Sequence, residues 1–302
     1  MSLSTIHVDG IDFKDDQNKV WHYVGMTASA LFKRWLMRDG PTALVEPNLR
    51  QWREMANEGG YDGEITLRVF RFAAAPNAFA LDPWSYPMGE VTNFTNYCNE
   101  RRFRIDWTCG DAQIVLPDPN GPKGQQQHLN EFCNALVPVA ATNFVQTCNE
   151  PFKNGIDVRR IVPPPSRMVD PKSPWGTYLR DSGMYYGGQW DTSTDLDFIS
   201  LHTDRGTEGR VVKWLGKIFE SAVFLWDIGK PPVQNEPMGF DEVDQPGSRS
   251  NNPRYAGLLG MGVAFTGIGF HSSAGQPCNQ FGPVTRLSAV SFFRGVKAGL
   301  GV

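Results

Sequence analysis

The sequence predicts an α/β fold, a closed (β/α)8 (TIM) barrel, and three observations support this prediction. Short apolar runs alternate with amphipathic stretches, a pattern typical of repeated βαβ units and a parallel sheet. Eight such runs within 302 residues match the strand number and the usual length of a barrel. The main rival is a doubly wound open sheet. Against it, no G-x-G-x-x-G follows the first predicted strand and no G-x-x-x-x-G-K-[ST] occurs, although nucleotide-binding open sheets typically carry such phosphate-binding turns.

The predicted strands are short apolar runs, and the second of them is rich in β-branched residues. In chain order they are Val20–Met26, Ile65–Phe72, Phe103–Trp107, Thr142–Cys148, Thr177–Asp181, Leu196–His202, Pro232–Asn235 and Val263–Phe270. The stretches between them predict helices at Ala28–Arg38, Leu49–Asn57, Gln125–Leu136, Glu208–Trp226 and Leu287–Leu300. The clearest helix is Glu208–Trp226, because its apolar residues recur at spacings of three and four and form one face.

Three long segments follow predicted strands: Ala73–Arg101, Thr108–Gly124 and Pro237–Leu258. Long loops in a compact domain are usually functional or disordered, and in a barrel the loops at the C-terminal ends of the strands build the active site. We therefore expect one barrel domain over residues 1–302, with these loops on its C-terminal face.

The charge balance favours a neutral substrate. The chain has 29 basic and 32 acidic side chains and a net charge of −3, which gives no electrostatic reason to expect nucleic acid or a membrane surface as a partner. No segment approaches the ~20 consecutive apolar residues of a spanning helix. Residues Met1–Asp16 lack the pattern of a secretory signal, so a cytoplasmic location is the default unless a leader was removed.

The cysteines and histidines do not predict a metal site. The five cysteines are scattered without a C-x-x-C pair, which argues against structural zinc. One disulfide between Cys98 and Cys109 remains open. The histidines never form H-x-H or H-E-x-x-H, and no cofactor is expected.

The tripeptide Asn-Glu-Pro occurs twice, as Asn149-Glu150-Pro151 and Asn235-Glu236-Pro237. The two copies follow the fourth and the seventh predicted strands. Carboxylates at two strand ends of one barrel can face each other over one glycosidic bond, as its cleavage requires. Two alternatives remain open: Glu150 as a carboxylate at a helix N-terminus, and Glu236 as a surface loop residue.

On these residues the sequence resembles the retaining glycoside hydrolases of clan A, which include the family 5 cellulases and mannanases. The resemblance implies that Glu150 is the acid/base and Glu236 the nucleophile. It also implies that Asn149 binds the sugar 2-hydroxyl and that Arg68, on the second strand, supports the nucleophile by a charged hydrogen bond. Strand alternation places Arg68 on the opposite face from Val69, so only one of the two points into the barrel.

The sequence departs from the family at two further positions. His202 is followed by Thr203-Asp204 instead of the family's x-Tyr, so a tyrosine such as Tyr185, or Asp204, is expected in that role. His271 stands near the place of the family's sugar-stacking Trp. Among the nine tryptophans, Trp107 is expected to bind substrate at a strand end, because sugars stack on aromatic faces.

The predicted function is therefore hydrolysis of a β-linked oligo- or polysaccharide with retention of configuration, through a covalent glycosyl-enzyme intermediate. One alternative is a barrel that binds carbohydrate without cleaving it. Another is a metal-dependent hydrolase that uses Asp106, Glu150, His202 and Glu236.

Overall fold

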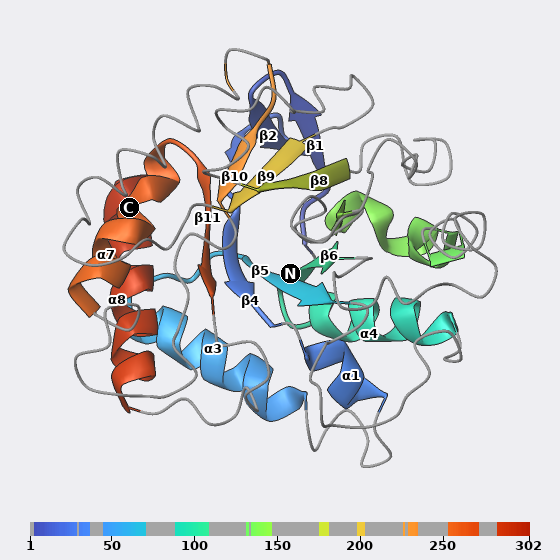
Figure 1. Cartoon of the computed structure of the whole chain (residues 1–302), viewed down its shortest axis with the longest axis horizontal. Helices are drawn as coiled ribbons and strands as arrows, with labels where there is room; N and C mark the ends of the chain where they lie inside the picture. Colours follow the sequence, from blue (N-terminus) through green and yellow to red (C-terminus); the bar gives the residue numbers. More distant parts are fainter. Residues whose placement is uncertain are drawn as a thin grey trace.

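The computed structural model describes residues 3–28, 30–36, 45–70, 88–108, 131–132, 134–146, 175–180, 198–202, 226, 229–234, 253–271 and 283–302. Within these residues, eight parallel strands close into a barrel in the order β10-β11-β4-β5-β6-β7-β8-β9 (Figure 1). Their bounds are β4 Val24–Thr27, β5 Ile65–Phe70, β6 Phe103–Thr108, β7 Phe144–Gln146, β8 Trp175–Arg180, β9 Phe198–His202, β10 Pro232–Gln234 and β11 Gly267–His271. Each predicted strand overlaps one of them in the predicted order, which confirms the (β/α)8 fold class.

A small antiparallel sheet precedes the barrel, and the sequence analysis did not predict it. It consists of β1 (Ile6–Asp9), β2 (Asp12–Asp15) and β3 (Val20–Trp21). The predicted first strand Val20–Met26 is therefore wrong as a single element. Its first part pairs with β2 in this sheet, and its second part is the barrel strand β4.

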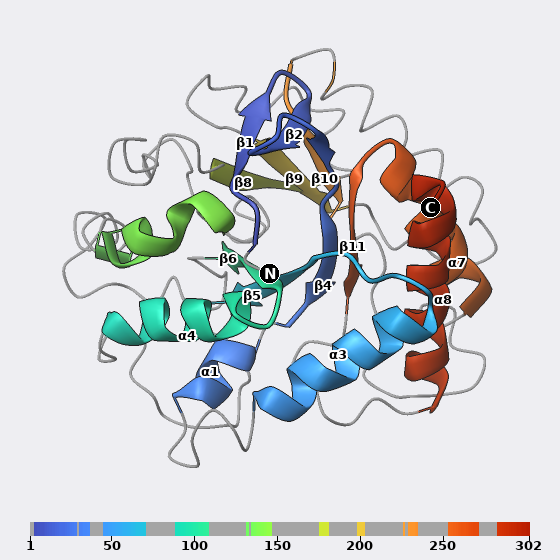
Figure 2. The same ribbon diagram turned by 180° about the vertical axis from the view of Figure 1, so that it is seen from behind.

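The antiparallel sheet packs against the amino-terminal end of the barrel (Figures 1 and 2). Phe13 from β2 contacts Phe144 and Phe198, which begin β7 and β9, with ring centroids 5.5 and 5.6 Å apart. Ile6 and Val233 are buried in the same cluster. Apolar side chains therefore fill this end of the barrel.

The described helices pack on the side of the barrel formed by β11, β4, β5 and β6, with α7 and α8 side by side on one flank in both views (Figures 1 and 2). Their bounds are α1 Leu31–Trp35, α3 Glu46–Glu58, α4 Gly89–Asn99, α7 Pro253–Met261 and α8 Pro283–Leu300, with short 3-10 helices at Val137–Thr142 and Gly262–Ala264. Of the predicted helices, Glu208–Trp226 lies almost entirely outside the described residues, and residues 131–132 and 134–136 are the helical part of Gln125–Leu136 that is described. No helix within the described ranges is both long and apolar enough to cross a membrane.

Two of the segments expected to be long loops contain helices. Helix α4 lies within Ala73–Arg101, and α7 begins within Pro237–Leu258. Both predictions of structureless loops are wrong over these residues. In α4, burial of Val91, Phe94 and Cys98 against the barrel stabilises a segment of modest helix propensity.

Cys98, on the buried face of α4, is a free thiol, so the disulfide to Cys109 that the sequence left open is not formed. Burial raises the pKa of this thiol above its usual range. Cys98 is therefore an inert core residue.

The barrel strands alternate between two buried faces. Leu67 and Val69 on β5 belong to the core between the barrel and its helices. Arg68, between them in the sequence, has the opposite orientation and is 1% exposed. Residues of this second parity fill the barrel interior and line its two ends.

Candidate active site at the carboxyl ends of the barrel strands

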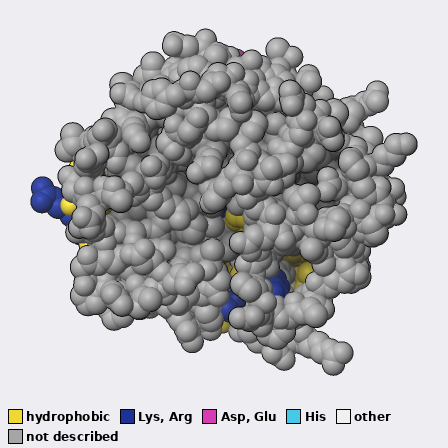
Figure 3. Space-filling view, in the orientation of Figure 1, with side chains coloured by type: hydrophobic (Ala, Val, Ile, Leu, Met, Phe, Trp, Pro, Cys, Tyr) yellow, Lys and Arg dark blue, Asp and Glu magenta, His cyan; other side chains and the backbone are white. Residues whose placement is uncertain are grey.

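The candidate site is the carboxyl-terminal end of the barrel, where the βα loops of (β/α)8 enzymes build their active sites. The last strand residues define it: Thr27, Phe70, Thr108, Gln146, Arg180, His202, Gln234 and His271. Among the described side chains visible in Figure 3, hydrophobic and basic ones predominate. The described part of the site is built from Thr27, Arg68, Phe70 and Thr108.

Arg68 is the charged group at the centre of the described part of the site. It lies inside the barrel on β5, and its Nε donates a hydrogen bond to Thr108 Oγ1 on β6 at 3.3 Å. Its guanidinium carbon lies 4.4 Å from the centroid of the Phe70 ring. The sequence prediction that Arg68 and Val69 take opposite faces is confirmed, since Val69 packs toward the helices.

The layer below this site is held by Tyr23 and Asp106. Tyr23 precedes β4, and its hydroxyl donates to Asp106 Oδ2 at 2.7 Å. Gly25 leaves room for the tyrosine ring, because a Cβ there would lie 2.5 Å from Tyr23 Cε1. Asp106 pairs in register with Arg68 and is fully buried, so it belongs to the barrel interior.

Trp107 does not line the site, and its predicted role in substrate binding is wrong. It is 0% exposed and lies between the barrel and the helices. Its ring contacts Phe32, Phe94 and Phe132 at centroid distances of 5.0, 5.5 and 5.2 Å. Its Nε1 donates to Thr95 Oγ1 on α4 at 3.1 Å. The reason is parity: Asp106 and Thr108 point inward, so Trp107 between them must point outward.

Two predicted site residues are the last residues of their strands. His202 ends β9 in register with Arg180 of β8, and His271 ends β11 in register with Thr27 of β4. Their backbone positions are therefore on the expected end of the barrel.

The remaining predicted site residues are Asn149, Glu150, Tyr185 and Glu236, which lie outside the described residues. The strand ends that precede Glu150 and Glu236 in the sequence are described. Glu150 follows the end of β7 in the sequence Gln146-Thr147-Cys148-Asn149-Glu150, and Glu236 follows the end of β10 in Gln234-Asn235-Glu236.

Sequence reasoning missed Phe70 and Thr108. Phe70 shares the parity of Arg68, and Thr108 pairs with Phe70 in register. Once Arg68 is known to point inward, strand alternation predicts the same direction for Phe70. The contact of Thr108 with Arg68 depends on the register between β5 and β6, which the sequence does not reveal.

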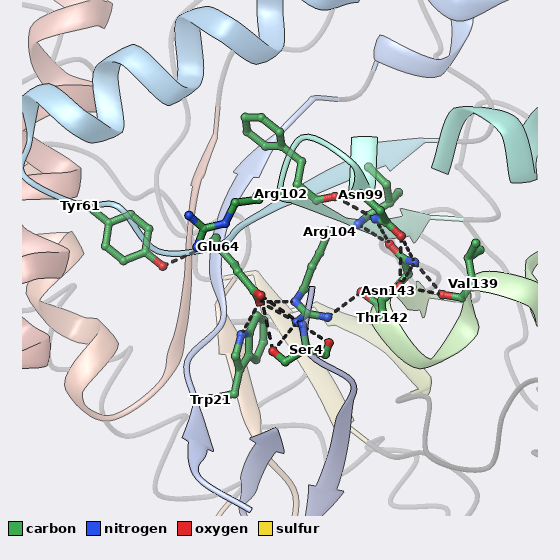
Figure 4. A network of polar contacts seen from close by, with 12 residues as sticks. Ser4, Trp21, Tyr61, Glu64, Asn99, Arg102, Arg104, Val139, Thr142 and Asn143 are labelled. Atoms are coloured by element: carbon green, nitrogen blue, oxygen red, sulfur yellow. Dashed lines mark hydrogen bonds and ion pairs between the residues drawn. The ribbon is translucent and has the colours of Figure 1, made fainter. Parts of the chain in front are cut away.

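A second polar network lies at the opposite end of the barrel (Figure 4). Arg104, near the start of β6, forms an ion pair with Glu64 at 2.6 Å and donates to the carbonyl oxygens of Thr142 and Ser4 at 2.8 and 2.7 Å. Burial lowers the pKa of Arg104, and Glu64 opposes this shift. This network joins the N-terminal segment to the amino-terminal end of the barrel, two strand positions before the level of Arg68.

Comparison with known proteins places the fold in one structural class. No family model and no curated protein sequence matches the chain. A β-glucanase from Saccharophagus degradans, solved with cellotetraose, is similar with a TM-score of 0.58 and 13% identity, covering 100% of this chain and 95% of that one. A β-mannanase from the blue mussel Mytilus edulis has a TM-score of 0.55 and 12% identity, covering 96% of each chain.

A Bacteroides vulgatus protein considered to be a glycoside hydrolase has a TM-score of 0.60 and 13% identity. The match covers 92% of this chain, which spans only 56% of the length of that protein. The chain therefore has the (β/α)8 barrel fold of glycoside hydrolases. Structures of family 5 cellulases and mannanases share this fold with it at low sequence identity, which agrees with the family resemblance seen in the sequence.

Proposed function

We propose that the protein is a retaining glycoside hydrolase that cleaves a β-linked glycan, with Glu150 as acid/base and Glu236 as nucleophile. One observation carries the proposal. Both Asn-Glu-Pro sequences come shortly after carboxyl ends of barrel strands: Asn235 directly follows β10, and Thr147-Cys148 separate β7 from Asn149. In a parallel barrel all such ends lie on one rim, which is the rim that forms active sites.

The separation of the two strands suits a retaining mechanism. β7 and β10 are separated by β8 and β9. Neighbouring strands are about 4.8 Å apart, so three strand steps give about 14 Å along the wall and less across the interior. Two glutamate side chains reaching inward can shorten that gap to the ~5–5.5 Å between carboxyl groups that a retaining enzyme needs.

Arg68 supports the assignment of the nucleophile. β5 lies three strands from β10 on the other side, through β4 and β11. A guanidinium held inside the barrel at this end favours the ionised form of a carboxyl group brought near it. We assign that carboxyl group to Glu236, because a nucleophile must be ionised to attack.

The reaction proceeds in two steps. Glu236 attacks the anomeric carbon while Glu150 protonates the leaving oxygen, and this forms a glycosyl ester. Glu150 then removes a proton from water, which hydrolyses the ester and restores both carboxyl groups. Two carboxyl groups suffice for this chemistry, so no cofactor is required.

The substrate is proposed to be an oligo- or polysaccharide. The cellotetraose bound to the similar Saccharophagus degradans β-glucanase supports this class of ligand. Asn149, Tyr185, His202 and His271 are proposed to bind its hydroxyl groups.

The test is covalent trapping with an aryl 2-fluoroglycoside, read by peptide mass spectrometry. The proposal expects a glycosyl label on Glu236 and no label in Glu236→Gln. In Glu150→Ala, hydrolysis of substrates with poor leaving groups should fall on the order of 10²–10⁴-fold, and azide should yield a glycosyl azide. Sugar binding without labelling or turnover would identify a carbohydrate-binding barrel instead, and loss of activity on chelation would favour the metal-dependent alternative.

A further inference from the structure

The side chain of Arg68 is held at two points by residues with no assigned role in the proposed reaction. An arginine side chain has many rotamers, so a guanidinium that must act at one place needs contacts that fix it. Thr108 and Phe70 both contact it from within the described barrel.

Thr108 provides the first contact. Its Oγ1 accepts the hydrogen bond from Arg68 Nε at 3.3 Å, and it is 1% exposed. Threonine is β-branched and therefore stiff at χ1. Its position on the neighbouring strand makes it a fixed acceptor, which orients the plane of the guanidinium.

Phe70 provides the second contact. Its ring lies 4.4 Å from the guanidinium carbon and is 5% exposed. Phe70 is the last residue of β5 and is two positions nearer than Arg68 to the carboxyl-terminal end. A cation–π contact of this kind gains strength when water is excluded.

We propose that Thr108 and Phe70 are positioning residues that fix the Arg68 guanidinium so that it keeps the catalytic nucleophile ionised. This inference rests on the proposed function. If the guanidinium is less well placed, its stabilisation of the carboxylate weakens and the pKa of the nucleophile rises. The acidic limb of the pH profile of kcat/KM then moves to higher pH, because the nucleophile must be deprotonated to attack.

The groups that face Arg68 from the neighbouring strands are fixed in register. Asp106 on β6 and Thr27 on β4 pair with Arg68, and His271 pairs with Thr27. Asp106 is bound by Tyr23. Substitution of Thr108 by valine leaves all of these groups in place. A changed pH profile of kcat/KM in this variant is therefore due to the loss of the Thr108 hydroxyl.

The decisive comparison is Thr108→Val against Thr108→Ser, with Thr66→Val as the matched control. Valine has the shape of threonine without the acceptor, whereas serine keeps the acceptor. Thr66 is also fully buried on the inward face of β5. Among the described residues, its Oγ1 has no hydrogen-bond partner. Thr66→Val therefore removes a similar hydroxyl without touching Arg68.

We expect Thr108→Val to lower kcat/KM by about tenfold and to move the acidic limb upward by about half a pH unit or more. Phe70→Leu should move it in the same direction, while Thr108→Ser and Thr66→Val should keep the wild-type profile. Circular dichroism checks that each variant is folded, and exchange of the Arg68 Nε proton, followed by nitrogen-15 NMR, should accelerate in Thr108→Val.

Two results separate the possible failures. An active wild type whose acidic limb is the same in folded Thr108→Val and Phe70→Leu overturns the positioning role alone. A wild type that labels with no 2-fluoroglycoside and hydrolyses no glycan overturns the proposed function and this inference together.

Discussion

Replacing Glu64 by glutamine should destabilise the protein strongly, because it removes the charge partner of a buried arginine. Arg104 is 0% exposed, and Glu64, just before β5, is 15% exposed. Glu64 Oε2 accepts hydrogen bonds from Arg104 Nε and Nη2 at 2.8 and 2.6 Å and from Trp21 Nε1 at 3.0 Å (Figure 4). The substitution keeps the size of the side chain but leaves the guanidinium charge uncompensated.

Breaking a buried ion pair by neutralising one partner costs about 3–5 kcal/mol. The carbonyl oxygens of Ser4 and Thr142 still accept hydrogen bonds from Arg104, which places the expectation near the lower end of this range. With an unfolding entropy of about 2.1 cal/mol/K per residue, the 302 residues give about 0.6 kcal/mol/K. A loss of about 3–3.5 kcal/mol, at the lower end of the range, therefore lowers Tm by about 5–6 °C.

Scanning calorimetry at pH 7 measures this change. Glu58→Gln is the matched control, because Glu58 pairs with Arg286 at 2.6 Å with both side chains exposed by 50% and 37%, and exposed pairs contribute about 0–1 kcal/mol. Adding Arg104→Met to Glu64→Gln should recover part of the loss, since the buried charge is then removed. Equal changes in Tm for Glu64→Gln and Glu58→Gln would refute the reasoning.

Two further predictions concern stability. Gly295→Ala should destabilise the protein by about 1–3 kcal/mol in a urea titration, because a Cβ there would lie 1.9 Å from the carbonyl oxygen of Gly257 across the contact of α7 and α8. As the control, Gly89→Ala in α4, where a Cβ meets open space, should be neutral or stabilising in the same titration. Burial and the hydrogen bond to Glu46 raise the pKa of Tyr97 to about 12, so its contribution to stability is complete below the unfolded pKa of about 10 and is lost as the pH rises to about 12. The urea midpoint should therefore fall less between pH 9 and 11.5 in Tyr97→Phe than in the wild type, and equal falls would contradict the assignment.

The barrel was predictable because its strands are buried on both faces and read as apolar runs in a regular order. The error in the first strand has a physical cause. Val20 to Met26 is apolar almost throughout, and nothing in its composition marks the point after Trp21 where the chain leaves the antiparallel sheet for the barrel. That change depends on pairing with β2, which is a non-local contact.

The two missed helices show why low helix propensity misleads. In α4, Val91, Phe94 and Cys98 are buried at helical spacing, but intervening asparagine and threonine residues resemble a loop. In α7, glycines lower the propensity and at the same time permit close packing on α8, since a Cβ at Gly260 would lie 2.1 Å from the carbonyl oxygen of Phe292. Tertiary packing therefore decides both elements.

In the candidate site, strand alternation predicts which residues share a face. The register between strands, which the sequence does not reveal, decides which of them are in contact. Alternation places Arg68 and Val69 on opposite faces, and the family resemblance assigns Arg68 to the site. Applied to β6, alternation separates Trp107 from Asp106 and Thr108, and the structure places Trp107 outside the barrel. The expectation for Trp107 was wrong because it followed residue type, the preference of sugars for aromatic rings, and not the parity set by Asp106.

The direction of the side chain does not distinguish the roles of the two buried arginines, because both point inward. Their positions along the strands do distinguish them. Arg68 and Arg104 both point into the barrel on neighbouring strands, and Arg104 pairs in register with Thr66, two residues before Arg68. Arg104 is therefore nearer the amino-terminal end, where Glu64 provides its carboxylate and the N-terminal segment encloses it. A charge enclosed in this way by its own network has a structural role. Arg68 is nearer the rim followed by both Asn-Glu-Pro sequences, which is why this arginine, and not Arg104, is the one to test for a role in catalysis.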